Sequence, residues 1–266
     1  MTRIFAITNQ KGGVGKTTTC VNLAASLAVT KRRVLLIDLD PQGNATMGCG
    51  VDKHDVARSS YDVLLGEASI AETAVKTETD NLDVIPSNSD LTAAEVALMN
   101  TEGREHRLRD ALAKVADDYD YVLIDCPPSL NMLTLNALTA AQGVIIPMQC
   151  EYYALEGLSA LVETIEQLRA SVNPQLEIEG LLRTMFDPRN RLANDVSSQL
   201  DVHFGDKVYR TLIPRNIRLA EAPSHGLPVI MYDKSSRGAV AYLALAGEIL
   251  RREEQQQQEV TAKAVG

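Results

Sequence analysis

The sequence predicts an α/β fold in which a mostly parallel, doubly wound sheet carries helices on both faces. First, short apolar runs alternate along the chain with longer stretches whose apolar residues recur at helical spacing. Second, a turn or helix signal follows each apolar run within a few residues, which suits right-handed crossovers between parallel strands. Third, a glycine-rich turn at residues 12–15 separates the first apolar run from the first helical stretch.

These patterns predict the elements in chain order. Strands are expected at residues 3–8, 33–38, 81–86, 121–125, 143–148 and 176–184. Helices are expected at residues 16–29, 92–100, 106–116, 130–141, 154–172, 191–204 and 238–252. Because no Pro-, Gly- or Ser-rich linker interrupts them, a single domain is predicted over residues 1–252, followed by a polar tail at 253–266 that is expected to fray.

Composition narrows the class of protein. A chain of 266 residues that is 45% hydrophobic can bury a sizeable core. No stretch approaches the roughly 20 apolar residues of a membrane helix, and the N-terminus lacks a leader pattern, so a cytoplasmic protein without a membrane partner is expected. The four cysteines are widely spaced with no C-x-x-C pair, which predicts reduced and mostly buried thiols.

Charge is distributed unevenly along the chain. The formal net charge is −9, which argues against a protein covered by basic surface. Between Gly180 and Ala220, however, seven basic residues stand against four acidic ones, so this segment carries a charge of +3. The asymmetry indicates a local basic patch.

The segment from Thr8 to Thr19, TNQKGGVGKTTT, is a variant of the phosphate-binding loop. The usual pattern is G-x-x-x-x-G-K-[ST], but Gln10 stands where the first glycine belongs, and Lys11 is an additional lysine. A strand that enters such a loop and a helix that leaves it direct backbone N–H groups at one point, at the positive end of the helix dipole. The segment therefore predicts a binding site for phosphate.

Individual residues of the loop have separate expected roles. Gly12, Gly13 and Gly15 let the backbone approach the phosphates closely. Lys16 can reach the β- and γ-phosphate oxygens, and the hydroxyl of Thr17 is placed to ligate Mg²⁺.

Carboxylates end two of the predicted strands. One strand closes on Asp38 and continues through Leu39 to Asp40, and another closes on Asp125. Mg²⁺ prefers oxygen ligands, and an apolar run that ends in Asp is the usual second half of a phosphate-loop NTPase site. Asp125 and Asp38 are therefore expected near the metal, and Asp40, two residues after Asp38, is a further functional candidate.

The motifs together resemble the ParA/Soj family of chromosome-partition ATPases, part of a deviant Walker class that includes MinD and the nitrogenase iron protein. The resemblance covers nearly the whole chain. It rests on the blocks KGGVGKTT from Lys11 to Thr18, DLDPQGN from Asp38 to Asn44, YDYVLIDCPPS from Tyr119 to Ser129, PMQCEYYALEG from Pro147 to Gly157, and PRNIRLAEAPSHG from Pro214 to Gly226.

The resemblance implies an ATPase that closes as a dimer around ATP and Mg²⁺. Lys11 would reach the partner subunit's phosphates, Asp40 would orient the attacking water, and hydrolysis would be slow until a partner completes the site. Pro214 and Asn216 would lie near the adenine. The full set of nucleotide-binding residues would be Lys11, Gly12, Gly13, Val14, Gly15, Lys16, Thr17, Thr18, Pro214 and Asn216.

The resemblance also implies macromolecular partners. The ATP dimer would bind double-stranded DNA without sequence preference, associate with the nucleoid, and be released by a centromere-binding partner of the ParB/Spo0J type. Arg189 and Arg218 match positions that the family uses for DNA, with Arg191 and Arg215 beside them. Such binding needs only cations that displace counterions from phosphates. Alternatively, these arginines pair with acidic neighbours on a solvated face.

Three other functions remain open at this point. A membrane-surface regulator like MinD would need a C-terminal amphipathic helix, and the segment RREEQQQQEVTAKAVG has almost no apolar face. A redox ATPase would need two cysteines per subunit at a dimer interface, for which Cys126 and Cys150 are candidates. A metabolic kinase or ligase would need a substrate pocket, which no motif indicates.

Overall fold

The computed structural model describes residues 2–99, 101–115 and 117–265. Its centre is a seven-stranded sheet with the order β3-β4-β2-β5-β1-β6-β7. All neighbouring strands are parallel except β3, which pairs antiparallel with β4 at one edge. The strands are β1 (Arg3–Ile7), β2 (Val34–Asp38), β3 (Val75–Lys76), β4 (Leu82–Ile85), β5 (Tyr121–Asp125), β6 (Gly143–Met148) and β7 (Glu177–Arg183).

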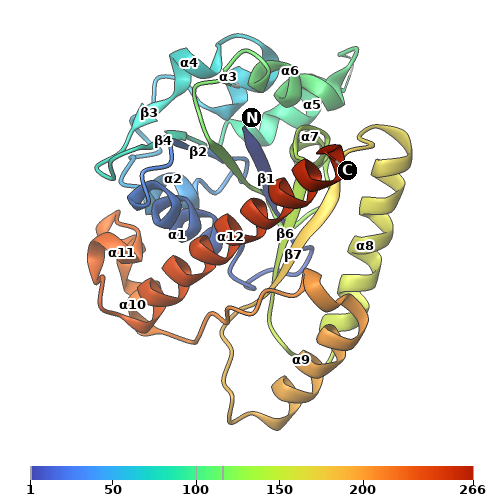
Figure 1. Ribbon diagram of the computed structural model, residues 1–266. Helices are drawn as coiled ribbons and strands as arrows, with labels where there is room; N and C mark the ends of the chain where they lie inside the picture. The colour runs from blue at the N-terminus through green and yellow to red at the C-terminus, as the bar shows by residue number, and fades with distance from the viewer. Residues whose placement is uncertain (1, 100, 116, 266) are drawn as a thin grey trace.

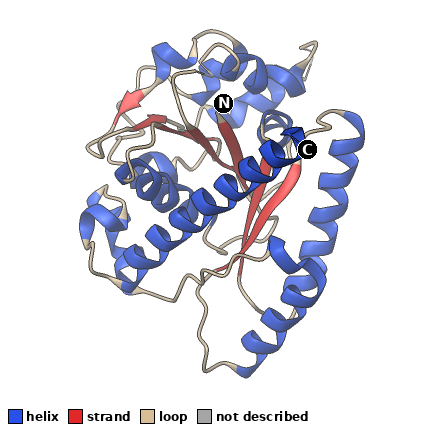
Figure 2. Cartoon of the chain, viewed as in Figure 1, coloured by secondary structure: helices blue, strands red, loops and turns tan. Residues whose placement is uncertain are grey.

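Helices cover both faces of this sheet (Figure 2), which confirms the predicted fold class. They are α1 (Lys16–Val29), α2 (Asn44–Gly48), α3 (Ser60–Leu65), α4 (Ile70–Thr73), α5 (Leu91–Leu98), α6 (Arg107–Leu112), α7 (Met132–Ala140), α8 (Ala154–Ser171), α9 (Arg191–Phe204), α10 (Ile217–Glu221), α11 (Val229–Tyr232) and α12 (Arg237–Val265). Short 3₁₀ turns lie at Arg104–His106, Gly205–Lys207 and Ala222–His225.

The two faces of the sheet form two cores. Side chains alternate along each strand, so that in β1 Phe5 and Ile7 face the core that contains α1 and α12, whereas Ala6 faces the other. Figure 1 shows α12 crossing the sheet beside α1. Helices α3, α5, α6, α7, α8 and α9 contribute to the opposite core. Near-continuous apolar strands are what a sheet covered on both faces requires.

Several short elements were not predicted. Strand β3 has two residues, and α2, α3, α4, α10 and α11 have four to six residues each, which is too short for a helical period to stand out. Local caps define two of them: Ser59 and Ser69 each begin a helix with a reciprocal capping box. The predicted ends of two helices, at residues 100 and 116, lie outside the described residues.

The expected helix end at residue 252 differs from the structure, in which α12 continues to Val265, and fraying of the tail stays a prediction. The Glu-, Gln- and Arg-rich sequence favours helix. Glu253 is also held in place, because its carboxylate accepts hydrogen bonds from Arg3 Nε at 3.2 Å and from the hydroxyl of Tyr121. The first strand and the last helix are therefore fastened together.

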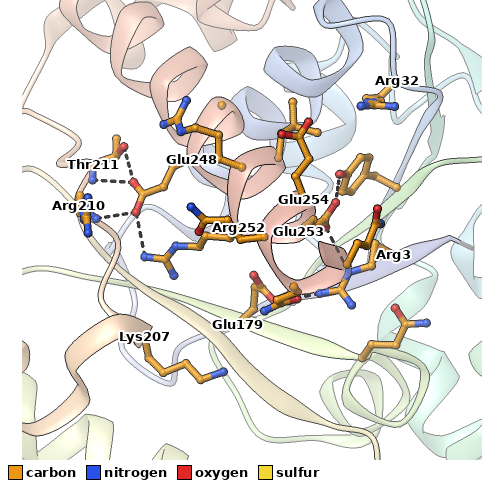
Figure 3. Close-up of a pocket in the computed structure, with 18 of the residues that line it drawn as sticks. Arg3, Arg32, Glu179, Lys207, Arg210, Thr211, Glu248, Arg252, Glu253 and Glu254 are labelled. Carbon is orange, nitrogen blue, oxygen red and sulfur yellow. Dashed lines mark hydrogen bonds and ion pairs between the residues drawn. The ribbon is translucent and has the colours of Figure 1, made fainter. Parts of the chain in front are cut away.

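A large polar hollow lies at the amino ends of the strands, bordered by α12 (Figure 3). The side chains that face it largely bind one another. Glu248 accepts the backbone N–H groups of Arg210 and Thr211 at 2.8 and 2.9 Å and pairs with Arg252 at 2.9 Å. These contacts tie α12 to the segment before Pro214. The hollow thus lies opposite the carboxyl ends of the strands, where ligands bind in open α/β sheets.

Candidate functional site

The loop between β1 and α1 has the backbone that the phosphate-loop prediction requires. Gly13 and Gly15 have φ of 73° and 87°, in the left-handed region that glycine adopts without steric cost. A Cβ atom added at Gly12 or Gly13 would meet nothing within 4 Å, so this part of the loop is open on its outer side. Helix α1 begins at Lys16, and the positive end of its dipole faces the loop. This geometry suits a bound anion.

Lys16 is the buried cation of the loop, with only 7% of its surface exposed. Its Nζ donates one hydrogen bond, to the backbone oxygen of Lys11 at 3.2 Å. Burial lowers the pKa of Lys16, while Asp125, Cys126 and Asp40 oppose that shift. An ammonium group has three donors. Lys16 therefore retains donors for a phosphate.

Asp38 and Asp125 lie side by side, because they are paired positions of neighbouring strands, and both are fully buried. Burial raises the pKa of Asp38 to about 6, although hydrogen bonds from Thr46 oppose the shift. Burial, followed by repulsion from Asp38, raises the pKa of Asp125 well above its ordinary value. Two adjacent buried carboxylates repel each other, and a cation between them would relieve that repulsion.

The donor set at Asp125 fits Mg²⁺. Its Oδ2 accepts a hydrogen bond from Thr17 Oγ1 at 2.7 Å, and its Oδ1 has no hydrogen-bond partner among the described residues. Carboxylate and hydroxyl oxygens are the ligands that Mg²⁺ takes. Thr17, Asp38 and Asp125, predicted from separate motifs, are thus brought to one place.

Asp40 lies at the margin of this cluster and is half-buried. Its backbone N–H donates to Asp38 at 3.0 Å, its Oδ1 accepts the N–H of Gln42 at 3.0 Å, and its carbonyl accepts the hydroxyl of Ser87 at 2.8 Å. The backbone on both sides of Asp40 is therefore fixed. The negative charge of Asp40 acts to raise the pKa of both Lys16 and Asp125.

Lys11 is exposed, and its Nζ pairs with Glu151 at 2.5 Å. The backbone N–H of Lys11 donates to Asn9 Oδ1 at 3.0 Å, and Asn9 in turn donates to the carbonyl of Pro147 at 2.9 Å. The end of β6 therefore supports the outer part of the loop. Glu151 was not recognised as a partner of Lys11 from the sequence.

Comparisons with known proteins agree with this geometry. A family model described as an AAA domain matches residues 2–178. Over 257 residues the chain is 54% identical to the chromosome partitioning protein ParA of Caulobacter vibrioides, with 96% of each chain covered. It is 55% identical to the sporulation initiation inhibitor protein Soj of Bacillus subtilis, covering 94% of this chain and 98% of that protein. The chain belongs to the ParA/Soj family.

Solved structures similar to this ParA/Soj chain share its fold. Cobyrinic acid a,c-diamide synthase of Mycobacterium smegmatis, solved with ADP and magnesium, is 40% identical, with a TM-score of 0.84 over 96% of both chains. The septum site-determining protein MinD of Pyrococcus horikoshii, solved with Mg-ADP, is 27% identical, with a TM-score of 0.76 over 94% of this chain and 96% of that one.

Other side chains of this ParA/Soj protein support the loop without having been predicted. Gln149 donates to the carbonyl of Gly13 at 2.9 Å, and Thr184 donates to the carbonyl of Val14 at 2.7 Å. Gln149 follows β6, the neighbour of β1, and Thr184 follows β7, one strand further out, so both lie at the edge of the sheet where the loop is. The rule that ligands bind at the carboxyl ends of the strands was the available signal.

Pro214 and Asn216 belong to a segment that an isolated β-bridge joins to the residues after β7. Pro214 pairs with Phe186 in an isolated parallel bridge, two residues beyond Thr184. Asn216 caps α10 by accepting the N–H of Arg218 at 3.0 Å. Met185, between Thr184 and Phe186, has φ of 49°, which is strained for a residue other than glycine. A contact of Pro214 and Asn216 with adenine stays a prediction.

The four candidate DNA-binding arginines are exposed and lie on two segments that the Phe186–Pro214 bridge joins. Arg189 forms two hydrogen bonds with Asp187 at 2.9 and 2.8 Å, and Arg218 pairs with Glu221 at 2.6 Å and Asp233 at 3.5 Å. Within the described part of the chain, Arg191 and Arg215 make no ion pair. Local pairing, the alternative interpretation, therefore holds for two of the four arginines.

The cysteines are free and buried, as predicted. Cys126 is 1% exposed and Cys150 is 7% exposed, and burial raises the pKa of both thiols. Buried, protonated thiols are poorly placed to share a cluster between two subunits. In the described ranges, no helix is long and apolar enough to cross a membrane.

Proposed function

We propose that this chain is an ATP-dependent DNA-partition switch that uses ATP and Mg²⁺. The observation that carries the proposal is the convergence of Lys16, Thr17, Asp38 and Asp125 below an open glycine loop. Its relative named chromosome partitioning protein ParA supports the partition role. The diamide synthase and MinD structures, solved with nucleotide and magnesium, support the choice of ligand.

In the proposed reaction, water attacks the γ-phosphorus of ATP and releases ADP and phosphate. Backbone N–H groups of the loop and the ammonium of Lys16 bind the phosphate oxygens, and Asp40 orients the water. Thr17, Asp38 and Asp125 would hold Mg²⁺, which when bound neutralises phosphate charge. The motifs contain no strong base besides these carboxylates, so hydrolysis by the chain alone is expected to be slow.

The proposed switch is a homodimer that closes around ATP. Lys11 is exposed on the outer side of the loop and would exchange Glu151 for the partner subunit's phosphates. Exposed ion pairs contribute little to stability, so this exchange costs little. In the dimer, the arginine surface doubles and binds duplex DNA through its phosphates.

The proposal is tested by ATPase assays with duplex DNA and a ParB-type partner, added separately and together. Low turnover by the chain alone and strong stimulation only when both are present are the expected results. Lys16→Ala is the control and should abolish nucleotide binding, because it removes the buried cation of the loop. High turnover without partners, or turnover that requires cobyrinic acid as a substrate, would favour a metabolic enzyme instead.

The alternative is a regulator at the membrane surface like MinD. The MinD structure shares the fold, but α12 is Gln-rich after Arg252. Co-sedimentation with anionic liposomes in the presence of ATP distinguishes the two functions, and the partition switch should remain in the supernatant.

A further inference from the structure

An exposed pair of aromatic rings lies beside the phosphate loop. Tyr152 is 75% exposed and Tyr153 is 70% exposed, whereas the other tyrosines and phenylalanines of the described chain are buried or half-buried. The two rings contact each other edge to face, with centroids 5.0 Å apart and an interplanar angle of 89°. This packing holds both rings in a defined arrangement, although no other aromatic ring among the described residues contacts them.

The position of the pair follows from the sheet. Strand β6 is a neighbour of β1, so the residues after β6 lie next to the phosphate loop that follows β1. Glu151, directly before Tyr152, contacts Lys11 of that loop. On the other side of the loop, after β5, Leu130 is 48% exposed. Exposed apolar side chains thus occur after both strands that neighbour β1.

A glycine on α8 extends this surface. Gly157 lies one helical turn after Tyr153, is exposed, and would have nothing within 4 Å of an added Cβ. Glycine within a helix is unfavourable relative to alanine, and no contact within the subunit requires it here. The absence of a side chain leaves room for another backbone to approach the helix.

From these observations we infer that Tyr152, Tyr153 and Gly157, which we term the tyrosine surface, are the main contact through which a second copy of this chain docks. The inference rests on the proposed ATP-dependent dimer and specifies which residues contribute most of its binding free energy. Tyrosine is enriched among the residues that dominate interface energies, because a rigid ring buries a large area at small entropic cost.

The charges beside the tyrosine surface favour a second copy over other occupants. A two-fold interface brings one patch against itself, so the patch must complement its own charges. Lys11 and Glu151 carry opposite charges side by side, so this part of the patch is neutral and does not repel its own copy across a two-fold axis. This local neutrality also avoids the repulsion expected between two chains of net charge −9.

The test is sedimentation analysis of the dimer with Mg²⁺ and a non-hydrolysable ATP analogue. Tyr152→Ala combined with Tyr153→Ala should raise the dimer dissociation constant about 30-fold or more, the usual effect of removing an interface hot spot. Gly157→Leu should also block dimerisation, because a bulky side chain would fill the space left for the partner. Val202→Ala, on α9, is the control, since Val202 is 81% exposed but lies on another helix.

Binding of a fluorescent ATP analogue at concentrations where the protein is monomeric checks that each variant folds, and it should match the wild type. Tyr152→Phe combined with Tyr153→Phe should preserve the dimer, since the rings remain. If the wild type dimerises and the tyrosine and Gly157 variants dimerise equally well, the tyrosine surface is not the contact. If the wild type itself stays monomeric with the analogue, the proposed switch fails instead.

Discussion

Asp125 is a fully buried carboxylate with one oxygen, Oδ1, that has no hydrogen-bond partner in the described structure. Repulsion from Asp38 affects its pKa more than attraction to Lys16 does. A protein without bound cation therefore loses stability by keeping this carboxylate ionised. Such a loss is expected where a site is prepared for a ligand.

Replacing Asp125 with asparagine should stabilise the ligand-free protein by about 1–3 kcal/mol at pH 7, since it removes an uncompensated buried charge. The folded-state pKa is raised, so the charge penalty is absent where the carboxyl is protonated and appears as the pH rises. The difference from wild type should therefore shrink towards pH 4. Urea unfolding between pH 4 and pH 8 measures it; equal stability throughout would contradict the interpretation. The same variant should lose Mg²⁺-dependent ATP binding.

Sequence patterns were most informative for residues whose role is encoded in a local motif. Lys16 and Thr17 belong to one short loop, and Asp38 and Asp125 end apolar strands, so their convergence could be predicted. Gln149 and Thr184 could not be identified, because their contacts depend on which strands are neighbours. Whether an arginine pairs with a nearby acid, as Arg189 does with Asp187, depends on side-chain geometry.

At the scale of the elements, a few buried polar contacts hold α12 against the segment around Arg210 and Thr211. The carboxylate of Glu248 accepts two backbone N–H groups and the hydroxyl of Thr211 at 2.8 Å, and it pairs with Arg252. The guanidinium of Arg252 also lies over the ring of Tyr209, 4.5 Å from its centroid. Burial alone would raise the pKa of Glu248, but the hydrogen bonds from Arg210 and Thr211 outweigh burial and lower it.

Glu248→Ala should lower the free energy of unfolding by about 2–4 kcal/mol, because it leaves buried donors unpaired. Since the folded-state pKa is lowered, the contribution of Glu248 is present at neutral pH and is lost as the pH falls below about 4.3, the ordinary value for glutamate. Glu248→Gln should therefore show a shallower loss of stability between pH 5 and pH 3. Chemical denaturation of both variants against wild type provides the measurement, and parallel pH profiles would exclude this role.

Long elements were predictable and short ones were not. The six strands expected from apolar runs are all present, and β3, which has two residues and lies at an edge, is the one that was missed. Helix α12 was predicted to end near residue 252 because polar composition was taken as a sign of fraying. Exposed Glu and Gln are good helix formers, and a helix anchored on the core can carry them beyond its buried part.

For the molecule as a whole, the distribution of charge connects the proposed dimer with DNA. The chain carries a net charge of −9, yet four exposed arginines gather on two bridged segments at the carboxyl side of the sheet. Arg191 and Arg215 are free of ion pairs in the described residues, whereas in the proposed complex Arg189 would exchange Asp187, and Arg218 would exchange Glu221 and Asp233, for phosphates. If the proposed surface binds DNA, these carboxylates would compete with the DNA phosphates for the two arginines.

Arg191→Ala and Arg215→Ala should each weaken DNA binding at all sequences and reduce the slope of log K against log salt by about 1 per lost contact. Asp187→Asn should tighten binding several-fold, since it frees Arg189. Lys207→Ala is the matched control, because Lys207 borders the hollow at the opposite end of the strands and pairs with Glu177. Fluorescence anisotropy with duplex DNA over a salt series measures the slopes; an effect of Lys207 equal to that of Arg215 would argue against a localised surface.

The contact between Arg3 and Glu253 joins the first strand to the last helix, 250 positions apart in the sequence. Strand β1 lies inside the sheet, and the core on its α1 side is closed by α12, which starts only at Arg237. During synthesis on the ribosome, that apolar face is only partly covered, by α1, until almost the whole chain has been translated. A nascent chain of this kind exposes aggregation-prone apolar surface for most of its synthesis and is expected to need chaperone protection until release.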